Sequence, residues 1–326
     1  MKKIILGVHG LGNKPPEELL EEWWRESINE GLRRIGKPHL DFNFEIVYWS
    51  NLLHPVPLDP KESNKDSELY LEEKYQPANT GKKKNKRTLK ELFLNFFNRQ
   101  RDKIFFNESI HLKFPSLTDL IIKHFFKDLD IYFTRECTEE NKSDCLAKDL
   151  IHQKLFDAIN RYKDRDILII AHSMGSIVLY EVLMRLAKDL DMRTLVTIGS
   201  PLGVPFILQK LKDDLNSVVT DENELYTPDC IIDNWINLAD VDDKLAQSAD
   251  LGKMFKPNKQ GVKPEMFIVD NDYDSEGIEN PHKSYGYLRT PELANIVDNF
   301  LSRGRNKFIL WLGRKFELIR HKFINL

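Results

Sequence analysis

The stretch DILIIAHSMGS, which runs from Asp166 to Ser176, decides the fold of this chain. Its first half is a continuous apolar run, which is typical of a strand buried on both faces in a parallel sheet. Residues 176–190 then follow a helical pattern, so Ser173 stands on a tight turn between strand and helix. Ala171 and Gly175 are small residues two places before and two places after this serine, which allows strand and helix to pack closely at the bend.

Outward from this stretch, strands and helices alternate. Further strands are predicted over residues 3–8, 42–49, 193–198, 234–238 and 265–269, and helices over residues 17–35, 145–162 and 292–301. Strands that alternate with helices indicate an α/β fold with a mostly parallel sheet covered by helices on both faces. We therefore expect one such domain over residues 1–302.

The alternation is interrupted between about residues 51 and 142. Prolines come first, then a basic run over residues 82–87, and then aromatic segments over residues 93–97 and 121–126. This region is predicted to be an inserted, partly helical cap. The basic run is interpreted as a solvated linker, so no nucleic-acid partner is expected.

Composition excludes several other classes of protein. The chain has 326 residues, a net charge of −3 and three cysteines, which do not form a disulfide framework or a zinc-binding spacing. No apolar run approaches the roughly 18 residues of a membrane span. Asp270, Asp272 and Asp274 have the spacing of a calcium loop, but the later glycine and glutamate of such a loop are missing. We expect a cytoplasmic protein without a metal or cofactor.

The position of Ser173 predicts a nucleophile, because a hydroxyl on a strand-to-helix turn is pushed above the edge of the sheet. The amide of Met174 would lie at the N-terminus of the helix and could bind a developing oxyanion. A second donor is predicted at Leu11, since His9-Gly10-Leu11-Gly12 follows the first strand and its glycines let the backbone curl. His9 is predicted to shape this loop by hydrogen bonds.

A serine nucleophile needs a base and an acid that orients the base. His282 is the candidate base, because it lies in the loop after the last predicted strand and before the last core helix. The acid is expected in the loop after the strand at residues 234–238. Asp242 is the first choice and Asp240 is its competitor.

These motifs, in the chain order Ser…Asp…His, resemble those of the α/β-hydrolase superfamily. The segment TIGSPLG at residues 197–203 looks like its lipase-like and GPI-deacylase-like branches. The resemblance covers residues 2–50 and about 145–302, and it implies a minimal core that hydrolyses esters or other acyl groups through an acyl-enzyme. The insertion and the C-terminal tail favour a carboxylic ester with a lipid-like or apolar acyl group as the substrate. The chain departs from the superfamily pattern in two respects. In the turn over residues 171–175, which we call the elbow, Ala171 replaces the first glycine, and the insertion comes before the nucleophile in the chain instead of after it.

Two alternatives to ester hydrolysis remain. The same triad could serve an acyltransferase or a thioesterase, and a hydrolase scaffold could also be a non-catalytic, membrane-associated protein. Residues 303–326 add a basic amphipathic helix, with seven basic residues against one acidic residue and an aromatic stripe. This pattern predicts peripheral binding to an anionic membrane surface. Packing of the helix on the insertion or on a second subunit explains it equally well.

Overall fold

The computed structural model describes residues 2–38, 41–78, 132, 142–187, 189–215, 224–246, 250–275 and 277–304, with only the backbone of residues 142–147. Within these residues the centre of the molecule is a six-stranded sheet with the order β2-β1-β3-β4-β6-β8. All five strand pairs are parallel. The chain therefore has an α/β fold with a parallel central sheet.

Most strands and helices follow the predicted ranges. The strands of the central sheet are β1 (Lys3–Val8), β2 (Phe44–Val47), β3 (Asp166–His172), β4 (Met192–Ile198), β6 (Ile231–Asp240) and β8 (Pro264–Val269). The expected helices are α1 (Glu17–Arg34), α4 (Lys142–Arg161), α5 (Met174–Arg185) and α9 (Pro291–Ser302). The main difference is β6, which is longer at both ends than the strand expected at residues 234–238.

Three of the described α-helices were not predicted from the sequence: α6 (Pro205–Leu215), α8 (Ser284–Leu288) and the four-residue α7 (Leu251–Met254). Helix α6 buries Ile207, Leu211 and Leu215, which recur every four residues and form one apolar face. Helix α8 is one short turn that follows the predicted His282 loop directly. The remaining elements are small: η1 (Ser50–Leu52), β5 (Leu225–Tyr226), β7 (Phe255–Lys256), β9 (Asp274–Ser275) and β10 (Ile278–Glu279).

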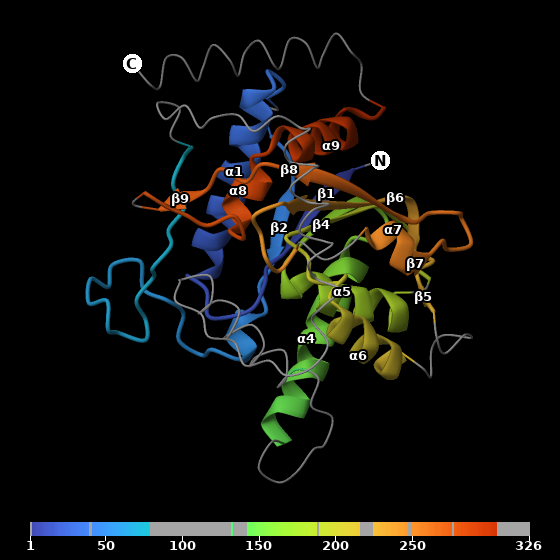
Figure 1. Cartoon of the computed structure of the whole chain (residues 1–326), viewed down its shortest axis with the longest axis horizontal. Helices are drawn as coiled ribbons and strands as arrows, with labels where there is room; N and C mark the ends of the chain where they lie inside the picture. The colour runs from blue at the N-terminus through green and yellow to red at the C-terminus, as the bar shows by residue number, and fades with distance from the viewer. Residues whose placement is uncertain are drawn as a thin grey trace.

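The core has two layers because successive side chains of a strand point to opposite faces of the sheet. In β3, Ile167 and Ile169 belong to the cluster beneath α4, α5 and α6, while Leu168 and Ile170 belong to the cluster beneath α1, α8 and α9. Figure 1 shows these two groups of helices on opposite sides of the strands. Burial on both faces explains why β1 and β3 are nearly continuous apolar runs.

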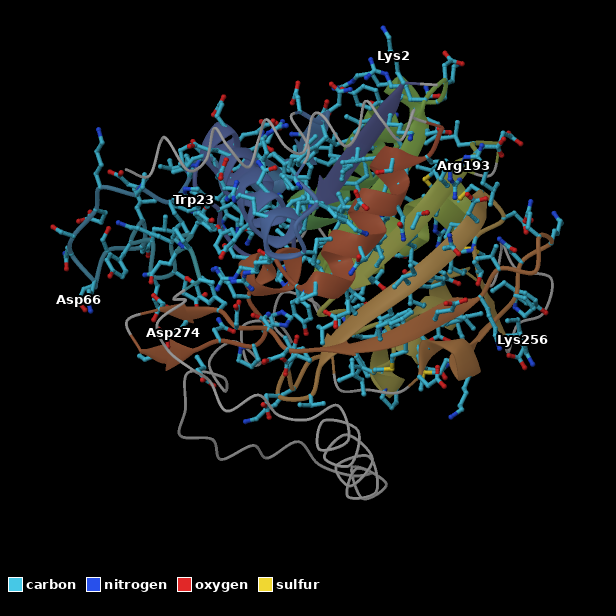
Figure 2. The ribbon with its side chains drawn as sticks, turned by 90° about the horizontal axis from the view of Figure 1, so that it is seen from above. Lys2, Trp23, Asp66, Arg193, Lys256 and Asp274 are labelled. Carbon is cyan, nitrogen blue, oxygen red and sulfur yellow. The ribbon has the colours of Figure 1, made fainter. Side chains whose placement is uncertain are left out.

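The beginning of the predicted insertion lies against the body of the domain. Residues 51–78 leave the end of β2 and return toward β9 and β10, and Figure 2 shows Asp66 out beyond Asp274, on the side away from Arg193. Tyr273 binds this segment by donating its hydroxyl to the carbonyl of Lys74 at 2.7 Å. Of the predicted cap, the structure describes residues 51–78, which pack on the domain, and Tyr132, which donates its hydroxyl to Glu181 at 2.6 Å.

Several sequence features lie outside the described residues. These are the basic run at residues 82–87, the aromatic segments at residues 93–97 and 121–126, and the tail from residue 305 onward. Within the described part of the chain, none of the helices combines the length and apolar character that crossing a bilayer requires.

The carboxyl ends of the strands meet at one edge of the sheet. Four of them, β1, β3, β6 and β8, lead into the loops that carry the predicted site residues. This edge is the usual position of a ligand site in an open parallel sheet.

Candidate active site

Ser173 has the strained backbone that its position on the turn predicts. Its φ of 52° is the one positive φ among the described non-glycine residues, and its ψ is −131°. Its amide donates to the carbonyl of Ile198 on the neighbouring strand at 3.1 Å, which helps to hold this conformation. Such strain persists only where the surrounding structure fixes it, and it gathers at functional sites.

Two glycines make room for the turn. A Cβ atom on Gly175 would lie 2.4 Å from the carbonyl oxygen of His9 and 2.9 Å from that of Val8. A Cβ atom on Gly10 would lie 2.9 Å from the Cβ of Ser173. The start of α5 therefore packs directly on the loop after β1, and neither position can hold a side chain without moving its neighbour.

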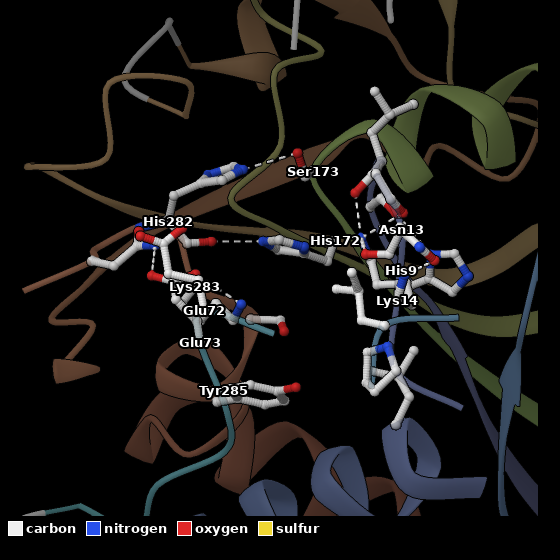
Figure 3. A pocket seen from close by; sticks show the side chains of 18 of the residues that line it. His9, Asn13, Lys14, Glu72, Glu73, His172, Ser173, His282, Lys283 and Tyr285 are labelled. Carbon is white, nitrogen blue, oxygen red and sulfur yellow. Dashed lines mark hydrogen bonds and ion pairs between the residues drawn. The ribbon is translucent and has the colours of Figure 1, made fainter. Parts of the chain in front are cut away.

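His282 lies within hydrogen-bond distance of Ser173. The separation between His282 Nε2 and Ser173 Oγ is 2.9 Å, as Figure 3 shows. On its other side, His282 Nδ1 lies 2.9 Å from Oδ2 and 3.0 Å from Oδ1 of Asp243. A carboxylate can only accept, so Nδ1 carries the proton and Nε2 is free to accept one from the serine.

The acid beside His282 is Asp243, and the predictions of Asp242 and of Asp240 are wrong on this point. Asp240 ends β6, and its carboxylate accepts from the amides of Asp242 at 2.7 Å and Asn271 at 2.6 Å. This turn carries the chain one residue further than expected before a side chain faces His282. Asp243 occupies that place.

Asp243 is buried, and its carboxylate is surrounded by hydrogen-bond donors. Its carboxylate accepts from the hydroxyl of Tyr287 at 2.8 Å and from the amides of Leu245 and Ala246 at 3.0 and 3.3 Å. Burial, followed by the charges of Asp243 and Asp240, raises the pKa of Tyr287 well above its ordinary value. Tyr287 therefore stays protonated and remains a donor to the carboxylate.

The predicted oxyanion donors belong to the start of α5 and to the loop after β1. Met174 is the first residue of α5, where backbone N–H groups have no partner within the helix. Leu11 lines the same cavity as Ser173 and His282. The loop that carries it is held by Lys14, whose ammonium group binds the carbonyls of Leu11 and, at 3.0 Å, Gly12.

His9 is structural, as predicted. Its Nε2 accepts from the amide of Trp49 at 3.1 Å, so its Nδ1 carries the proton and donates to the carbonyl of Gly10 at 2.7 Å. Burial, together with the charge of Lys14, lowers the pKa of His9 well below its ordinary value. This neutral ring fixes the bend between β1 and the Leu11 loop.

His172 was not assigned a role from the sequence, but it supports the His282 loop. Its Nε2 lies 2.7 Å from the carbonyl oxygen of His282, and the two ring centres are 4.9 Å apart. Burial, with a further contribution from His282, lowers the pKa of His172 well below its ordinary value. The neutral ring therefore donates from Nε2 and ties the backbone of His282 to the end of β3.

These residues open into a cavity of about 400 Å³. Figure 3 looks into it, with His282, Lys283, Glu73 and Tyr285 on one side and Asn13 and Lys14 on the other. Its apolar wall is made by Leu20, Trp24, Leu58, Leu71, Leu245 and Tyr285. The size and the mainly apolar lining are those of small-molecule sites.

The described residues contain no cluster of three side chains suited to hold a metal. Two members of the aspartate series are engaged elsewhere: Asp272 pairs with Arg289 at 2.6 Å and with Arg34 at 2.8 Å, and Asp274 accepts from the amide of Gly277. The chain matches no family model, and no curated protein matches it.

The close approach at Gly175 leads to a stability prediction. Gly175→Ala should lower the free energy of unfolding by about 1–3 kcal/mol or more, because the new methyl group collides with backbone rather than with a flexible side chain. Urea unfolding followed by circular dichroism measures the change.

Gly261→Ala is the matched control, because Gly261 has a φ of +80° but nothing within 4 Å of an added Cβ. It should cost only about 1 kcal/mol of backbone strain. A Gly175→Ala protein as stable as the wild type would contradict the packing described for the elbow.

Proposed function

We propose that the chain is a serine hydrolase of the α/β-hydrolase type, which cleaves carboxylic esters with an apolar, lipid-like acyl group. The observation that carries this proposal is the continuous set of contacts from Ser173 Oγ to His282 Nε2, at 2.9 Å, and from His282 Nδ1 to Asp243, at 2.9 Å. Nucleophile, base and orienting acid in this order are the parts of a catalytic triad.

In the proposed reaction, Ser173 Oγ attacks the ester carbonyl while His282 Nε2 accepts the hydroxyl proton. The amides of Met174 and Leu11 donate to the oxyanion of the tetrahedral intermediate. His282 then protonates the leaving alcohol, and an acyl-enzyme on Ser173 remains. Water then attacks the acyl group while His282 accepts its proton, and His282 returns this proton to Ser173 Oγ as the carboxylic acid leaves. Asp243 holds the tautomer that each step needs.

The cavity supports an apolar acyl group rather than a charged one. Leu20, Trp24 and Tyr285 form part of the apolar wall of the cavity. An acyl chain that packs on them is stabilised by about 25 cal/mol for each Å² of apolar surface removed from water. The two lysines of the cavity, Lys14 and Lys283, already bind loop carbonyls and Glu73. They are therefore poor sites for an anionic substrate.

The proposed membrane association depends on the tail at residues 303–326, of which only Arg303 and Gly304 are described. Its net charge of +6, from seven basic residues and one acidic residue, would attract it to an anionic surface. Such a helix would bring the esterase to a lipid substrate.

The nucleophile can be tested with a fluorophosphonate probe, which labels only an activated serine. The wild-type protein should be labelled, and Ser173→Ala should abolish labelling with the fold intact, since the variant removes only the attacking oxygen. In-gel fluorescence measures the adduct. Labelling that persists in the variant would transfer the role to another serine, and an unlabelled wild type would favour the non-catalytic scaffold.

The acid can be tested by comparing two neighbouring aspartates. Asp243→Asn should reduce kcat on a soluble aryl ester by about 10⁴, because the amide favours the wrong tautomer of His282. Asp242→Asn serves as the matched control and should retain most of the activity. The opposite ranking would restore Asp242 as the orienting acid.

The tail can be tested with vesicles that contain phosphatidylserine. Each basic residue near an anionic surface is worth about 1 kcal/mol and is screened by salt, so binding should weaken steeply as the salt concentration rises. Deletion of residues 305–326 should remove binding in a sedimentation assay and leave hydrolysis of a soluble ester intact. A truncated protein that is insoluble or inactive on that ester would show that the tail belongs to the fold.

A further inference from the structure

Glu73, from the first part of the insertion, reaches the loop that carries His282. Its Oε1 accepts from the side-chain amide of Asn280 at 2.5 Å, and its Oε2 accepts from the ammonium group of Lys283 at 2.8 Å. Both carboxylate oxygens of Glu73 thus accept hydrogen bonds from the loop that carries His282. Figure 3 shows Glu73 and Lys283 together beside His282 at the edge of the cavity.

The two partners of Glu73 stand on either side of His282 in the chain. Lys283 is the next residue, and Asn280 also binds His282 directly, because its Oδ1 accepts from the His282 amide at 3.0 Å. Asn280 is buried, so its amide group has one orientation that satisfies both bonds. Glu73 therefore fixes the side chain that in turn fixes the backbone of His282.

The position of Glu73 does not depend on this loop alone. The residues after it are bound to the body of the domain: Lys74 accepts from Tyr273 at 2.7 Å, Gln76 accepts from Arg289 at 2.6 Å, and the amide of Ala78 donates to Glu30 at 2.9 Å. Before it, the side chain of Leu71 is buried. Glu73 is carried by an anchored segment and can act as a fixed point for the His282 loop.

The charge of Glu73 is maintained where it lies. Burial alone would raise the pKa of this carboxyl, but the charge of Lys283 and the hydrogen bonds from Asn280 and Lys283 outweigh burial and hold its pKa below the ordinary value. The carboxylate is therefore ionised at neutral pH. An ionised acceptor makes stronger bonds to both partners than a neutral one would.

The opposite side of the loop is held by the core. Asn271 donates to the carbonyls of Pro281 and Lys283, each at 2.9 Å, and His172 donates to the carbonyl of His282. These bonds all go to carbonyls. The backbone of Asn280 is held as well, because its amide donates to the carbonyl of Tyr273 at 3.1 Å. Glu73, through the side chain of Asn280, adds a restraint that acts on the amide of His282.

We propose that Glu73 is a positioning residue for His282, so that the insertion completes the catalytic apparatus instead of only covering it. The proposal rests on the proposed function of the triad. A displacement of the catalytic histidine by about 1 Å can reduce the rate of the catalysed reaction by up to about a hundredfold. Loss of the Glu73 carboxylate should therefore reduce turnover without removing any group that touches the substrate's reacting atoms.

The test compares Glu73→Gln with Glu72→Gln in the full-length chain. Glutamine keeps the size of Glu73 but places an NH₂ group against one of two donors, so Glu73→Gln should lower kcat on a soluble aryl ester by roughly tenfold to a hundredfold. KM should change little. Glu72 is exposed and lines the same cavity, so Glu72→Gln removes an equal charge from the same rim and should cost clearly less.

A second measurement reads the position of His282 without using activity. The proton that Nδ1 shares with Asp243 should give a downfield ¹H NMR resonance, assigned by its loss in His282→Ala. This resonance should broaden in Glu73→Gln, because a looser loop exchanges the proton faster, and should stay as in the wild type in Glu72→Gln. Thermal unfolding of the two variants checks that each is folded at the temperature of the measurements, and Glu73→Gln should unfold at a somewhat lower temperature because it loses the ion pair with Lys283.

The outcomes separate this proposal from the proposed function. Equal kcat losses in the two glutamine variants, or an unchanged resonance in Glu73→Gln, would overturn the positioning role while leaving the triad intact. If the wild-type protein shows the resonance but hydrolyses no ester, the proposed esterase function is wrong. The effect of Glu73 on the position of His282 is then decided by the NMR comparison alone. If Glu73→Gln does not fold, Glu73→Asp replaces it. Aspartate keeps the charge but is too short to reach both partners, so an unchanged kcat there would also refute the proposal.

Discussion

The strained backbone of Ser173 is the constraint on which the rest of the site depends. A φ of 52° is costly for a residue with a side chain, and it persists because β3 lies in the middle of the sheet while α5 begins immediately after it. Gly175 lets α5 pack on the carbonyls that end β1, and Gly10 lets the next loop approach the serine itself. The same contacts that hold the strain therefore bring the Leu11 loop beside Ser173.

The other loops of the site are joined to one another as well as to the sheet. Asn271 is the clearest case, because its backbone amide binds Asp240 and its side chain binds two carbonyls of the His282 loop. One residue thus connects the end of β6, which leads to Asp243, with the loop that carries His282. Asp240 acts as a structural anchor in this connection, which leaves Asp243 to face the imidazole. Glu73 adds a third source of support from a segment distant in the sequence.

Much of the fold followed from the sequence, because β1 and β3 are short apolar runs that end at glycine-containing turns, a pattern typical of buried parallel strands. The strand at residues 3–8 was predicted with its exact bounds, and Ser173 and His282, predicted from chain order, lie together. The acid was harder to assign. Three aspartates crowd one loop at positions 240, 242 and 243, and the choice among them depends on a turn formed by side-chain bonds to Asp240. A sequence pattern does not contain that geometry.

The residues that support the site could not be predicted from the sequence, for a related reason. Glu73 lies in a polar stretch without periodicity, and it meets Asn280 and Lys283 across more than two hundred positions of the chain. Tyr287 lies in no distinguishing motif, and the motif that contains His172 does not indicate which carbonyl its ring binds. Such contacts arise from how the chain is arranged in space, whereas strand and elbow patterns arise from neighbouring residues.

The central claim is that Ser173, activated by His282 and Asp243, carries the acyl group of an ester between two chemical steps. Trapping that intermediate tests it most directly. The protein would be mixed with an activated aryl ester, quenched in acid at short times and digested for mass spectrometry. The account predicts a transient mass increase equal to the acyl group on the peptide that contains Ser173, accompanied by a burst of released phenol. Rapid turnover without an adduct on Ser173, or an adduct on another residue, would contradict it.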